Sequence, residues 1–460
     1  MRPALAALAA VCMLVIAAVA SAARPESPRV VKTSTLPAIG LAAFQQTALP
    51  GSVPHASSPT LDDRGIELGG IGSDLYRDAS MDENEFYMVT DRGPNTRPSV
   101  SGERRRTFPN EWFTPTILHV DASGPTLQIL DAIPIVTDGS DQDTACDDAV
   151  TGLSNLPTYD ERPWNFNGTA ALTPNPNGLD TEGLVRAPNG DFWLVDEYSP
   201  SLIRVGPDGC VEERFVPELP LLAAGYALTP ASYPVSGTIP RIYQRRRQNR
   251  GFEGLAIYGN SLFVATQSPL LNPNSSTGQA SRNTRILRFD IAAEQVTGEW
   301  VYRFDEVCAF SGEAAGCAIS PDEMKVSGLV ALSDTRLLVQ ERTDLVTKIY
   351  TVELTDDNRL GAKWSDPTQS PTLESLSTDQ ALAAQGVAVP VKTLVADLTG
   401  IVPNKIEGIA VVNPRQIAVA NDNDFQLTDG TAFDANGNVS SLTGIPSQVL
   451  RIWLPALLPG

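Results

Sequence analysis

A motif that occurs four times constrains most strongly how this chain can fold. Each copy opens with Glu or Ser, continues with Gly and then Leu or Ile, and leads through two apolar runs separated by a turn to a polar pair. The opening and closing residues are 14 positions apart in every copy. This constant spacing indicates one repeated supersecondary unit. The copies are TEGLVRAPNGDFWLVDEY (181–198), FEGLAIYGNSLFVATQ (252–267), VSGLVALSDTRLLVQER (326–342) and IEGIAVVNPRQIAVANDND (406–424).

Each copy is typical of a β-hairpin. Both arms are short and rich in Val, Ile, Leu and aromatic residues, and the turns carry Pro, Asn, Gly, Ser or Asp. Further strand candidates follow each hairpin, and the copies start at residues 182, 253, 327 and 407, which leaves room for four strands per unit. Repeated four-stranded sheets in one chain predict an all-β fold, a β-propeller. The alternative is a β-sandwich in which the similarity between the segments is accidental.

A fifth, divergent copy over 69–95 carries Ser73 and Asp74 where three of the others have Glu and Gly. We therefore expect a propeller of five blades, or of six if 96–180 contains another. The last copy has only three strand candidates before the chain ends, and residues 30–38 resemble the apparent fourth strand of the preceding unit. The N-terminal strand is thus expected to close the ring, which removes an exposed sheet edge.

The N-terminus is typical of a secretory signal peptide, because a short basic start precedes an apolar run and the small residues Ala20, Ser21 and Ala22. The alternative is an uncleaved membrane anchor. No other stretch is long and apolar enough to cross a bilayer, so we expect a secreted or periplasmic protein with no membrane contact after cleavage. The expected organisation is a signal peptide over 1–22, an N-terminal segment with the ring-closing strand over 23–67 and a propeller domain over 68–460.

Removal of the signal peptide would leave four cysteines in an exported chain. An even number in this setting predicts two disulfides. Cys308 and Cys317 are close enough in sequence to staple one loop, which leaves Cys146 to pair with Cys210. The alternative is that all four are unpaired, buried thiols.

The formal net charge of −20 argues against a nucleic-acid-binding protein, which needs a positive field. The chain has two histidines, His55 and His119, which leaves little room for a His-rich zinc site or for the active site of a His-dependent phosphatase. Neither lies in the setting of a Ser-His-Asp hydrolase. Most of the 34 basic residues are arginines, whose planar fork suits phosphate and carboxylate groups. The sequence does not indicate an oligomeric state.

Hairpin geometry predicts where the polar ends of the motif gather. In an antiparallel pair, the start of the first strand and the end of the second lie at the same end, so in a ring they surround one mouth of the channel. Crowded carboxylates repel one another unless cations, Arg or protons neutralise them, and oxygen ligands suit Ca²⁺ or Mg²⁺. The alternative is that each Glu accepts backbone N–H bonds within its blade. The acidic residues expected at this mouth are Glu182, Glu253, Glu407, Asp196, Glu197, Glu341, Asp422 and Asp424.

Two arginine-rich loops are expected on the same face. Arg104, Arg105 and Arg106 follow the divergent copy, and a second group that ends at Arg250 precedes the copy opening at Glu253. Arginines beside bound cations would attract a small anionic substrate such as a phosphate ester. The alternative is a solvated basic face that pairs with acidic loops.

Several motifs resemble the phytase-like domain family, whose members are secreted and often described as having esterase-like activity. In order over roughly residues 68–425, they are TDRGPN, DTEGL, FWLVDEYSPSLIRV, NRGFEGLA, ATQSPL, SGLVAL, LLVQERTD, KIEGIA and NDND. The resemblance implies a propeller-like fold, export and hydrolysis of phosphate monoesters or related esters, with phytate as a candidate substrate. The Glu-Gly opening is also similar to that of gluconolactonase-type propellers, in which such a Glu ligates a divalent metal in the channel. Ser73 and Asp74 depart from this opening, which removes one carboxylate.

These features predict an enzyme that uses Ca²⁺ or Mg²⁺ to help water attack a small anionic ester directly, since no Ser, Cys or His nucleophile setting is visible. One alternative is a non-catalytic propeller that binds a ligand or partner and holds a structural metal. Another is a lactonase or carboxylesterase. The expected residues are Glu182, Glu253, Glu407, Asn421 and Asp422 for the metal, Arg92, Arg250 and Arg342 for the substrate anion, and Asp196, Glu197 and Glu341 for catalysis.

Overall fold

The computed structural model describes residues 26–54, 62–138, 145–153, 160–218, 231–311 and 319–459. The expected signal peptide and His55 therefore lie outside the described residues. Within these ranges, no helix is long and apolar enough to cross a membrane.

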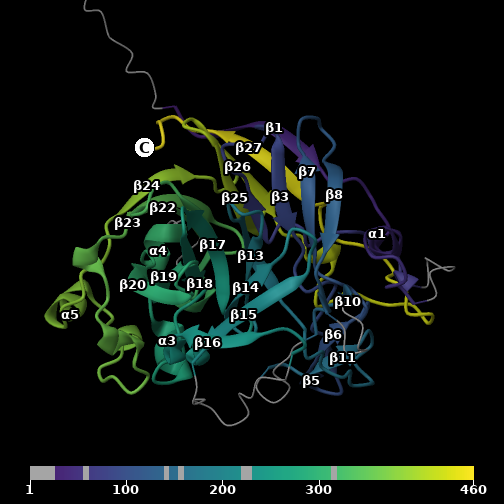
Figure 1. Ribbon diagram of the computed structural model, residues 1–460, viewed down its shortest axis with the longest axis horizontal. Helices are drawn as coiled ribbons and strands as arrows, with labels where there is room; N and C mark the ends of the chain where they lie inside the picture. Colours follow the sequence, from purple (N-terminus) through teal and green to yellow (C-terminus); the bar gives the residue numbers. More distant parts are fainter. Residues whose placement is uncertain are drawn as a thin grey trace, which may run out of the picture.

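Five sheets follow one another around a ring, so the fold is a five-bladed β-propeller (Figure 1). Blade 1 consists of β2 (Asp74–Tyr76), β3 (Glu85–Val89), β7 (Thr116–Asp121) and β8 (Gln128–Pro134). Blade 2 consists of β12 (Thr181–Arg186), β13 (Phe192–Asp196), β14 (Ser201–Val205), β15 (Val211–Pro217) and β16 (Val235–Ile239). Blade 3 consists of β17 (Phe252–Tyr258), β18 (Ser261–Thr266), β19 (Asn283–Asp290) and β20 (Gln295–Arg303). Blade 4 consists of β21 (Lys325–Ala331), β22 (Arg336–Arg342), β23 (Thr347–Glu353) and β24 (Lys392–Asp397).

Blade 5 confirms the expected ring closure. Its first three strands are β25 (Ile406–Asn413), β26 (Gln416–Asn421) and β27 (Gln448–Trp453), and its outermost strand is β1 (Arg29–Thr35) from the N-terminal end of the described chain. The β1 strand pairs antiparallel with β27, and Figure 1 shows the purple β1 beside the yellow β27. The ends of the propeller sequence are thus joined by backbone hydrogen bonds within one sheet.

The five innermost strands surround the channel in the order of the chain. The strands β2, β12, β17, β21 and β25 each contact the innermost strands of the two neighbouring blades, and β25 meets β2 to complete the circle. Each copy of the repeated motif is the first hairpin of a blade, so its opening residue lies at the start of an innermost strand.

The described part of 96–180 forms no sixth blade. Of the two expected blade numbers, five is therefore correct. This segment supplies β7 and β8 of blade 1. It also supplies several short strands that do not belong to any blade. Those strands pair only in two-stranded sheets, which are too small to pack between blades. They are β4 (Ser99–Val100), β5 (Glu103–Arg104), β6 (Arg106–Phe108), β9 (Val136–Asp138), β10 (Cys146–Ala149) and β11 (Pro163–Asn165).

The hydrophobic core consists mainly of clusters between adjacent blades. Strand β13 shows the principle: Phe192 and Leu194 face blade 1, whereas Trp193 and Val195 face blade 3. Because a blade is covered on both faces, its strands are apolar throughout rather than alternating between apolar and polar residues. This arrangement explains the continuous apolar runs of the repeat.

A few helices and one described disulfide complete the fold. The Cys146–Cys210 bond joins β10 to the turn after β14 with a Cα–Cα distance of 5.8 Å, which confirms this pairing. The second expected pair includes Cys317, which lies outside the described residues. The helices are α1 (Leu41–Ala48), α3 (Ser275–Ala280), α4 (Val307–Ser311) and α5 (Asp379–Ala384).

Candidate functional site

The Glu-Gly or Ser-Gly opening of each repeat lies at an irregularity in the innermost strand. A bulge of this kind changes the direction of a side chain relative to a regular strand. The opening residues Glu182, Glu253 and Glu407 line a polar pocket at this end of the channel. The register with the second strand shifts between Thr181 and Leu184, Phe252 and Gly254, Val326 and Leu329, and Ile406 and Gly408.

The glycine after the opening residue lets neighbouring innermost strands approach closely. A Cβ atom on Gly254 would lie 2.2 Å from the backbone oxygen of Ser327 in the next blade. A Cβ atom on Gly408 would lie 2.8 Å from the backbone carbon of Asp74. Neither position has room for a side chain, so the motif requires glycine where neighbouring innermost strands meet.

The third residues of the five motif copies together divide the channel into two cavities. Each blade contributes one large aliphatic side chain, and each is at most 3% exposed. These five side chains form an apolar septum between the polar pocket and a second cavity, and no residue lines both cavities. The septum residues are Leu75, Leu184, Leu255, Leu329 and Ile409.

The polar pocket has a volume of about 180 Å³, and the opening glutamates of three blades meet in it. One oxygen each from Glu182, Glu253 and Glu407 lies within 4.8 Å of the others, and all three residues are buried. A second group, formed by Asp180, Glu182 and Glu197, meets the same criterion and shares Glu182. The Oε2 atom of Glu253 is buried without a hydrogen-bond partner among the described residues. A buried, unpaired carboxylate oxygen is costly and indicates that a further positive group belongs beside it.

The charges that line the pocket do not balance. Eight carboxylates and six basic side chains line it, and Arg106 and Lys325 also pair with Glu161 and Asp344 outside it, so at least two negative charges remain when all are ionised. One divalent cation or two protons would neutralise two of these charges. The carboxylates belong to Asp91, Asp180, Glu182, Glu197, Glu253, Glu407, Asp422 and Asp424, and the basic side chains to Arg92, Arg106, Arg250, Lys325, Arg342 and Lys405.

Two basic side chains pair with Glu407, Asp422 and Asp424. Arg342, at the end of β22, forms an ion pair with Glu407 and lies 3.7 Å from Glu253 Oε1. Lys405 Nζ lies 2.9 Å from Asp422 Oδ2 and 2.6 Å from Asp424 Oδ2. These contacts leave Glu182 without a described ion pair.

Arg92 and Arg250 also line the pocket, and both have partners within the protein. Arg92 Nη1 lies 3.4 Å from Asp180 Oδ2, and its guanidinium stacks 4.1 Å from the centre of the Tyr198 ring. Arg250 Nη1 donates to Ser268 Oγ at 3.1 Å and to the backbone oxygen of Asp322 at 2.6 Å. Burial and the neighbouring Arg247 lower the pKa of Arg250 to about 10, so its guanidinium is still cationic at neutral pH.

The carboxyl groups of the cluster resist ionisation to different degrees. Burial, with repulsion from Glu253 and Glu197, raises the pKa of Glu182 well above its usual range. Burial raises the pKa of Glu407 to about 8, even though Arg342 acts in the opposite direction. Although burial opposes ionisation of Asp422, the Lys405 ammonium lowers the pKa of this carboxyl. The cluster therefore favours neutralisation at the glutamates of the motif rather than at Asp422.

The structure brings most of the expected site residues together. Those that line the polar pocket are Glu182, Glu253, Glu407 and Asp422 from the expected metal set, Glu197 from the expected catalytic set, and Arg92, Arg250 and Arg342 from the expected substrate set.

Three expected site residues lie away from the pocket. Asp196 Oδ2 pairs with Arg214 Nη2 at 2.8 Å, within blade 2. Glu341 Oε2 pairs with Lys392 Nζ and accepts a hydrogen bond from the Tyr302 hydroxyl at 2.7 Å.

Asn421 is the third, and its Oδ1 accepts the Gln448 backbone N–H at 2.7 Å, which caps the start of β27. All three residues close a hairpin, so they lie one strand farther from the axis than the opening residue. Their side chains make contacts with outer strands or loops of the propeller instead of facing the channel.

Lys325, Lys405 and Asp180 also line the pocket, although the sequence reasoning did not single them out. Each stands two positions before the opening residue of its copy. Because side chains two apart in an extended segment share a face, this position could have been included.

Most residues of the two arginine-rich loops do not reach the pocket. Only Arg106 and Arg250 from these loops line it, as far as the described residues show. Arg104 pairs with Asp429 and Arg246 with Asp160, so part of the basic charge stabilises loops. His119 lies outside this site and contacts Glu85 Oε2 at 3.1 Å.

Comparison with curated proteins finds a fungal relative. An uncharacterized secreted protein of Arthroderma benhamiae is 28% identical over 271 residues, which cover 53% of this chain and 52% of the relative. The chain therefore spans about half the length of the curated relative that it matches.

Solved structures include distant matches. A luciferin-regenerating enzyme is 12% identical with a TM-score of 0.33, over 85% of this chain and 95% of that one. A PQQ-bound aldose sugar dehydrogenase from Streptomyces coelicolor is 13% identical with a TM-score of 0.29, over 80% of this chain and 98% of that one. Likeness at this level carries no argument about the chemistry of the site.

The family comparison covers most of the chain and includes all five copies of the hairpin opening. The phytase-like family model, which carries the description "Esterase-like activity of phytase", matches residues 66–425. The chain therefore belongs to the phytase-like family.

Proposed function

We propose that this protein is a secreted or periplasmic hydrolase of small anionic esters, with phosphate monoesters as the first substrate class and a divalent cation, Ca²⁺ or Mg²⁺, at the polar pocket. The observation that carries the proposal is the convergence of Glu182, Glu253 and Glu407 within 4.8 Å of one another. The unpaired Glu253 Oε2 and the excess of at least two negative charges support a doubly charged ligand there.

The donor set fits a hard cation. The described residues that line the pocket offer carboxylate, amide and hydroxyl oxygens and contain no His or Cys. Oxygen ligands of this kind suit Ca²⁺ and Mg²⁺ rather than softer metals. Glu182, Glu253 and Glu407 would hold the ion, with Asp422 nearby. When bound, such an ion supplies positive charge that polarises an ester oxygen.

The basic residues of the pocket suit the anionic part of a substrate. Arg92 and Arg250 present guanidinium groups to the same cavity as the acidic cluster, and a guanidinium fork matches phosphate oxygens. Positive side chains in the same pocket as a cation site would help to orient a phosphate. Orientation of this kind lowers the entropic part of the reaction barrier.

Glu197 is the residue best placed to accept a proton from attacking water. Its Oε1 accepts a hydrogen bond from Gln267 Nε2 at 3.0 Å, which orients the carboxylate. Burial and repulsion from Glu253 raise the pKa of Glu197 well above its usual range. Arg92, Arg250 and a bound cation would favour its ionised form, and an ionised carboxylate with a raised pKa is a stronger general base than an exposed one.

Export is part of the same proposal. The relative from Arthroderma benhamiae carries the name of a secreted protein, and the Cys146–Cys210 disulfide is typical of an oxidising compartment. The N-terminal sequence pattern supports the same location.

The activity test uses full-length protein freed of metal with a chelator. We expect phosphate release from phytate and p-nitrophenyl phosphate to require added Ca²⁺ or Mg²⁺. Glu253→Gln should lower kcat/KM by about two orders of magnitude and weaken calorimetric Ca²⁺ binding, while the fold is retained. The control is Glu212→Gln, which changes an exposed glutamate on β15 and should leave both readouts unchanged. Metal-independent activity, or equal effects of the two variants, would contradict the proposal.

A second candidate is a binding propeller with a structural cation. It is favoured by the ion pair between Arg342 and Glu407, because this contact already engages one basic group of the pocket within the protein. Calcium-dependent thermal stability without turnover on phosphate or carboxylate esters would select this function. Turnover of p-nitrophenyl acetate without turnover of p-nitrophenyl phosphate would instead select a carboxylesterase or lactonase.

A further inference from the structure

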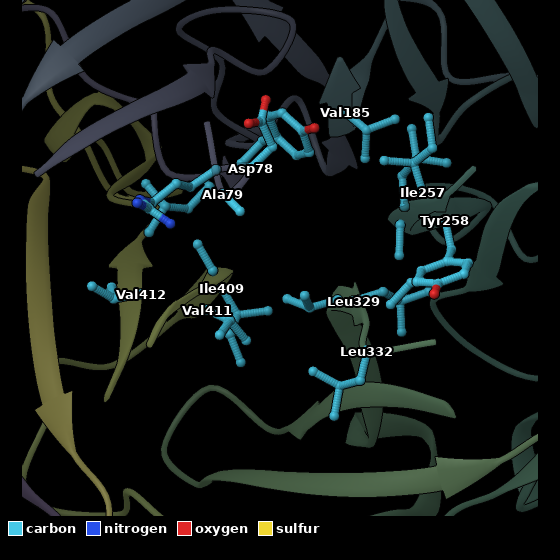
Figure 2. Close-up of a pocket in the computed structure, with 18 of the residues that line it drawn as sticks. Asp78, Ala79, Val185, Ile257, Tyr258, Leu329, Leu332, Ile409, Val411 and Val412 are labelled. Atoms are coloured by element: carbon cyan, nitrogen blue, oxygen red, sulfur yellow. The ribbon is translucent and has the colours of Figure 1, made fainter. Parts of the chain in front are cut away.

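A second and larger cavity lies on the other side of the apolar septum from the polar pocket (Figure 2). Its volume is about 650 Å³, and all five innermost strands contribute to its wall. Figure 2 shows Val185, Ile257, Leu332 and Val411 around the open space. We refer to this cavity as the apolar funnel.

The septum closes the floor of the apolar funnel. Leu75, Leu184, Leu255, Leu329 and Ile409 line this cavity and are almost completely buried. The polar pocket and the apolar funnel share no lining residue. An occupant of the funnel therefore enters from the rim.

Few charges face the apolar funnel. The Arg77 guanidinium donates to the backbone oxygens of Asp82 and Met81, at 3.1 and 2.8 Å. Asp78 Oδ1 accepts the Ser80 backbone N–H at 2.6 Å. At the floor, the buried Asp74 carboxyl accepts the backbone N–H of Leu184 at 2.8 Å. The ionisable groups thus have partners within the protein, and aliphatic side chains dominate the wall.

The end of the described chain helps to hold the rim in shape. Leu458 lines the apolar funnel, and its backbone N–H donates to the Pro414 oxygen in the β25–β26 turn at 2.8 Å. The Tyr258 side chain also stands at this cavity, and the residue is 48% exposed. Its hydroxyl has no hydrogen-bond partner in the described part of the chain, so it can offer a polar contact to a bound molecule.

The geometry points to a binding site for a small, uncharged, largely apolar molecule in the apolar funnel. Ordered water needs several polar partners, which this wall does not supply. Cavities of a few hundred cubic ångströms with an apolar wall and a few polar groups are typical of sites for small ligands. The closed floor and the limited volume favour a small molecule over a protein segment. This site does not depend on the chemistry proposed for the polar pocket.

The test uses the full-length protein and N-phenyl-1-naphthylamine, an uncharged apolar fluorophore. We expect saturable fluorescence enhancement with one site per chain. Val411→Trp fills part of the funnel and should weaken binding by about tenfold or more, because a closely packed site does not accept the added volume. The matched control is Val391→Trp, which changes a residue that is 71% exposed outside the cavity and should alter the affinity by less than about twofold.

Two further measurements keep the test decisive. If Val411→Trp does not fold by circular dichroism, Ile257→Glu replaces it, because a carboxylate in an apolar cavity should also abolish probe binding. Phosphate-ester activity should persist in the folded variant, which separates this site from the polar pocket. Unchanged affinity in the folded variant would overturn the proposal. The proposal would also be overturned if probe binding disappeared as the chain self-associated in sedimentation, because a second copy would then occupy the funnel.

Discussion

At the scale of single residues, Arg342 determines how much of the acidic cluster is already neutralised. Its guanidinium is buried, forms an ion pair with Glu407 and lies 3.7 Å from Glu253. Its Nε also donates to Ser327 Oγ at 2.7 Å, which fixes the orientation of the fork. Arg342 therefore compensates one buried charge and leaves the remaining excess to a cation or to protons.

Replacement of the Arg342 side chain should lower the free energy of unfolding, because it leaves buried carboxylates without a partner. We expect Arg342→Met to lower the free energy of unfolding by about 3 kcal/mol, because a buried charge that loses its partner is strongly destabilising. Urea denaturation of the metal-free protein at neutral pH measures the change.

The same strand offers the control. Arg336, at the other end of β22, pairs with Glu353, and the two side chains are 28% and 40% exposed. Arg336→Met should therefore cost less than about 1 kcal/mol. Equal losses from the two variants would show that Glu253 and Glu407 are not held by Arg342 as described.

At the scale of the element, the innermost strand combines three requirements in three consecutive residues. The opening glutamates line the polar pocket, the glycine allows close contact between strands, and the Leu or Ile contributes to the septum. In blade 4 the opening Ser327 does not line this pocket and instead donates to Glu253 Oε1 at 3.3 Å. In blade 1 the first two residues are Ser73 and Asp74. Asp74 accepts the Leu184 backbone N–H at 2.8 Å, so there a side-chain hydrogen bond links the neighbouring innermost strands.

A methyl group at the glycine position should force the innermost strands apart. Gly254→Ala would place Cβ 2.2 Å from the Ser327 backbone oxygen, and we expect a loss of about 2 kcal/mol in the free energy of unfolding. Denaturant unfolding measures this loss.

A second glycine provides the comparison. A Cβ on Gly361 would have no neighbouring atom within 4 Å, so Gly361→Ala should change stability by less than about 1 kcal/mol. If Gly254→Ala is as well tolerated as Gly361→Ala, the strands can separate without cost. The close approach of the innermost strands would then not be required by the fold.

At the scale of the whole molecule, two connections hold the ring. Hydrogen bonds between β1 and β27 join the N-terminal strand to blade 5. The Cys146–Cys210 disulfide joins the margin of blade 1 to blade 2 and closes a segment with a sequence separation of 64. A covalent link of this span restricts the unfolded chain more than it alters the folded one.

Removal of the disulfide should lower global stability without altering the site. We expect the double variant Cys146→Ser, Cys210→Ser to lose about 2–4 kcal/mol in the free energy of unfolding. Urea titration under non-reducing conditions measures this change, with the Ca²⁺ binding that the proposed function predicts as the readout for an intact pocket. An unchanged unfolding midpoint would mean that the link does not restrict the unfolded chain.

The repeat was sufficient to predict the propeller, the closure of its ring and the gathering of Glu182, Glu253 and Glu407 at one mouth. Regular spacing of hairpins carries this information, because equivalent positions in a ring of equal units must lie on one face. Which polar residues face the channel became clear from the three-dimensional arrangement of the strands. Bulges at the openings redirect side chains, while Asp196, Glu341 and Asn421 make contacts with outer strands or loops. The same arrangement also revealed the apolar funnel, since its septum depends on how closely five separate strands approach one another.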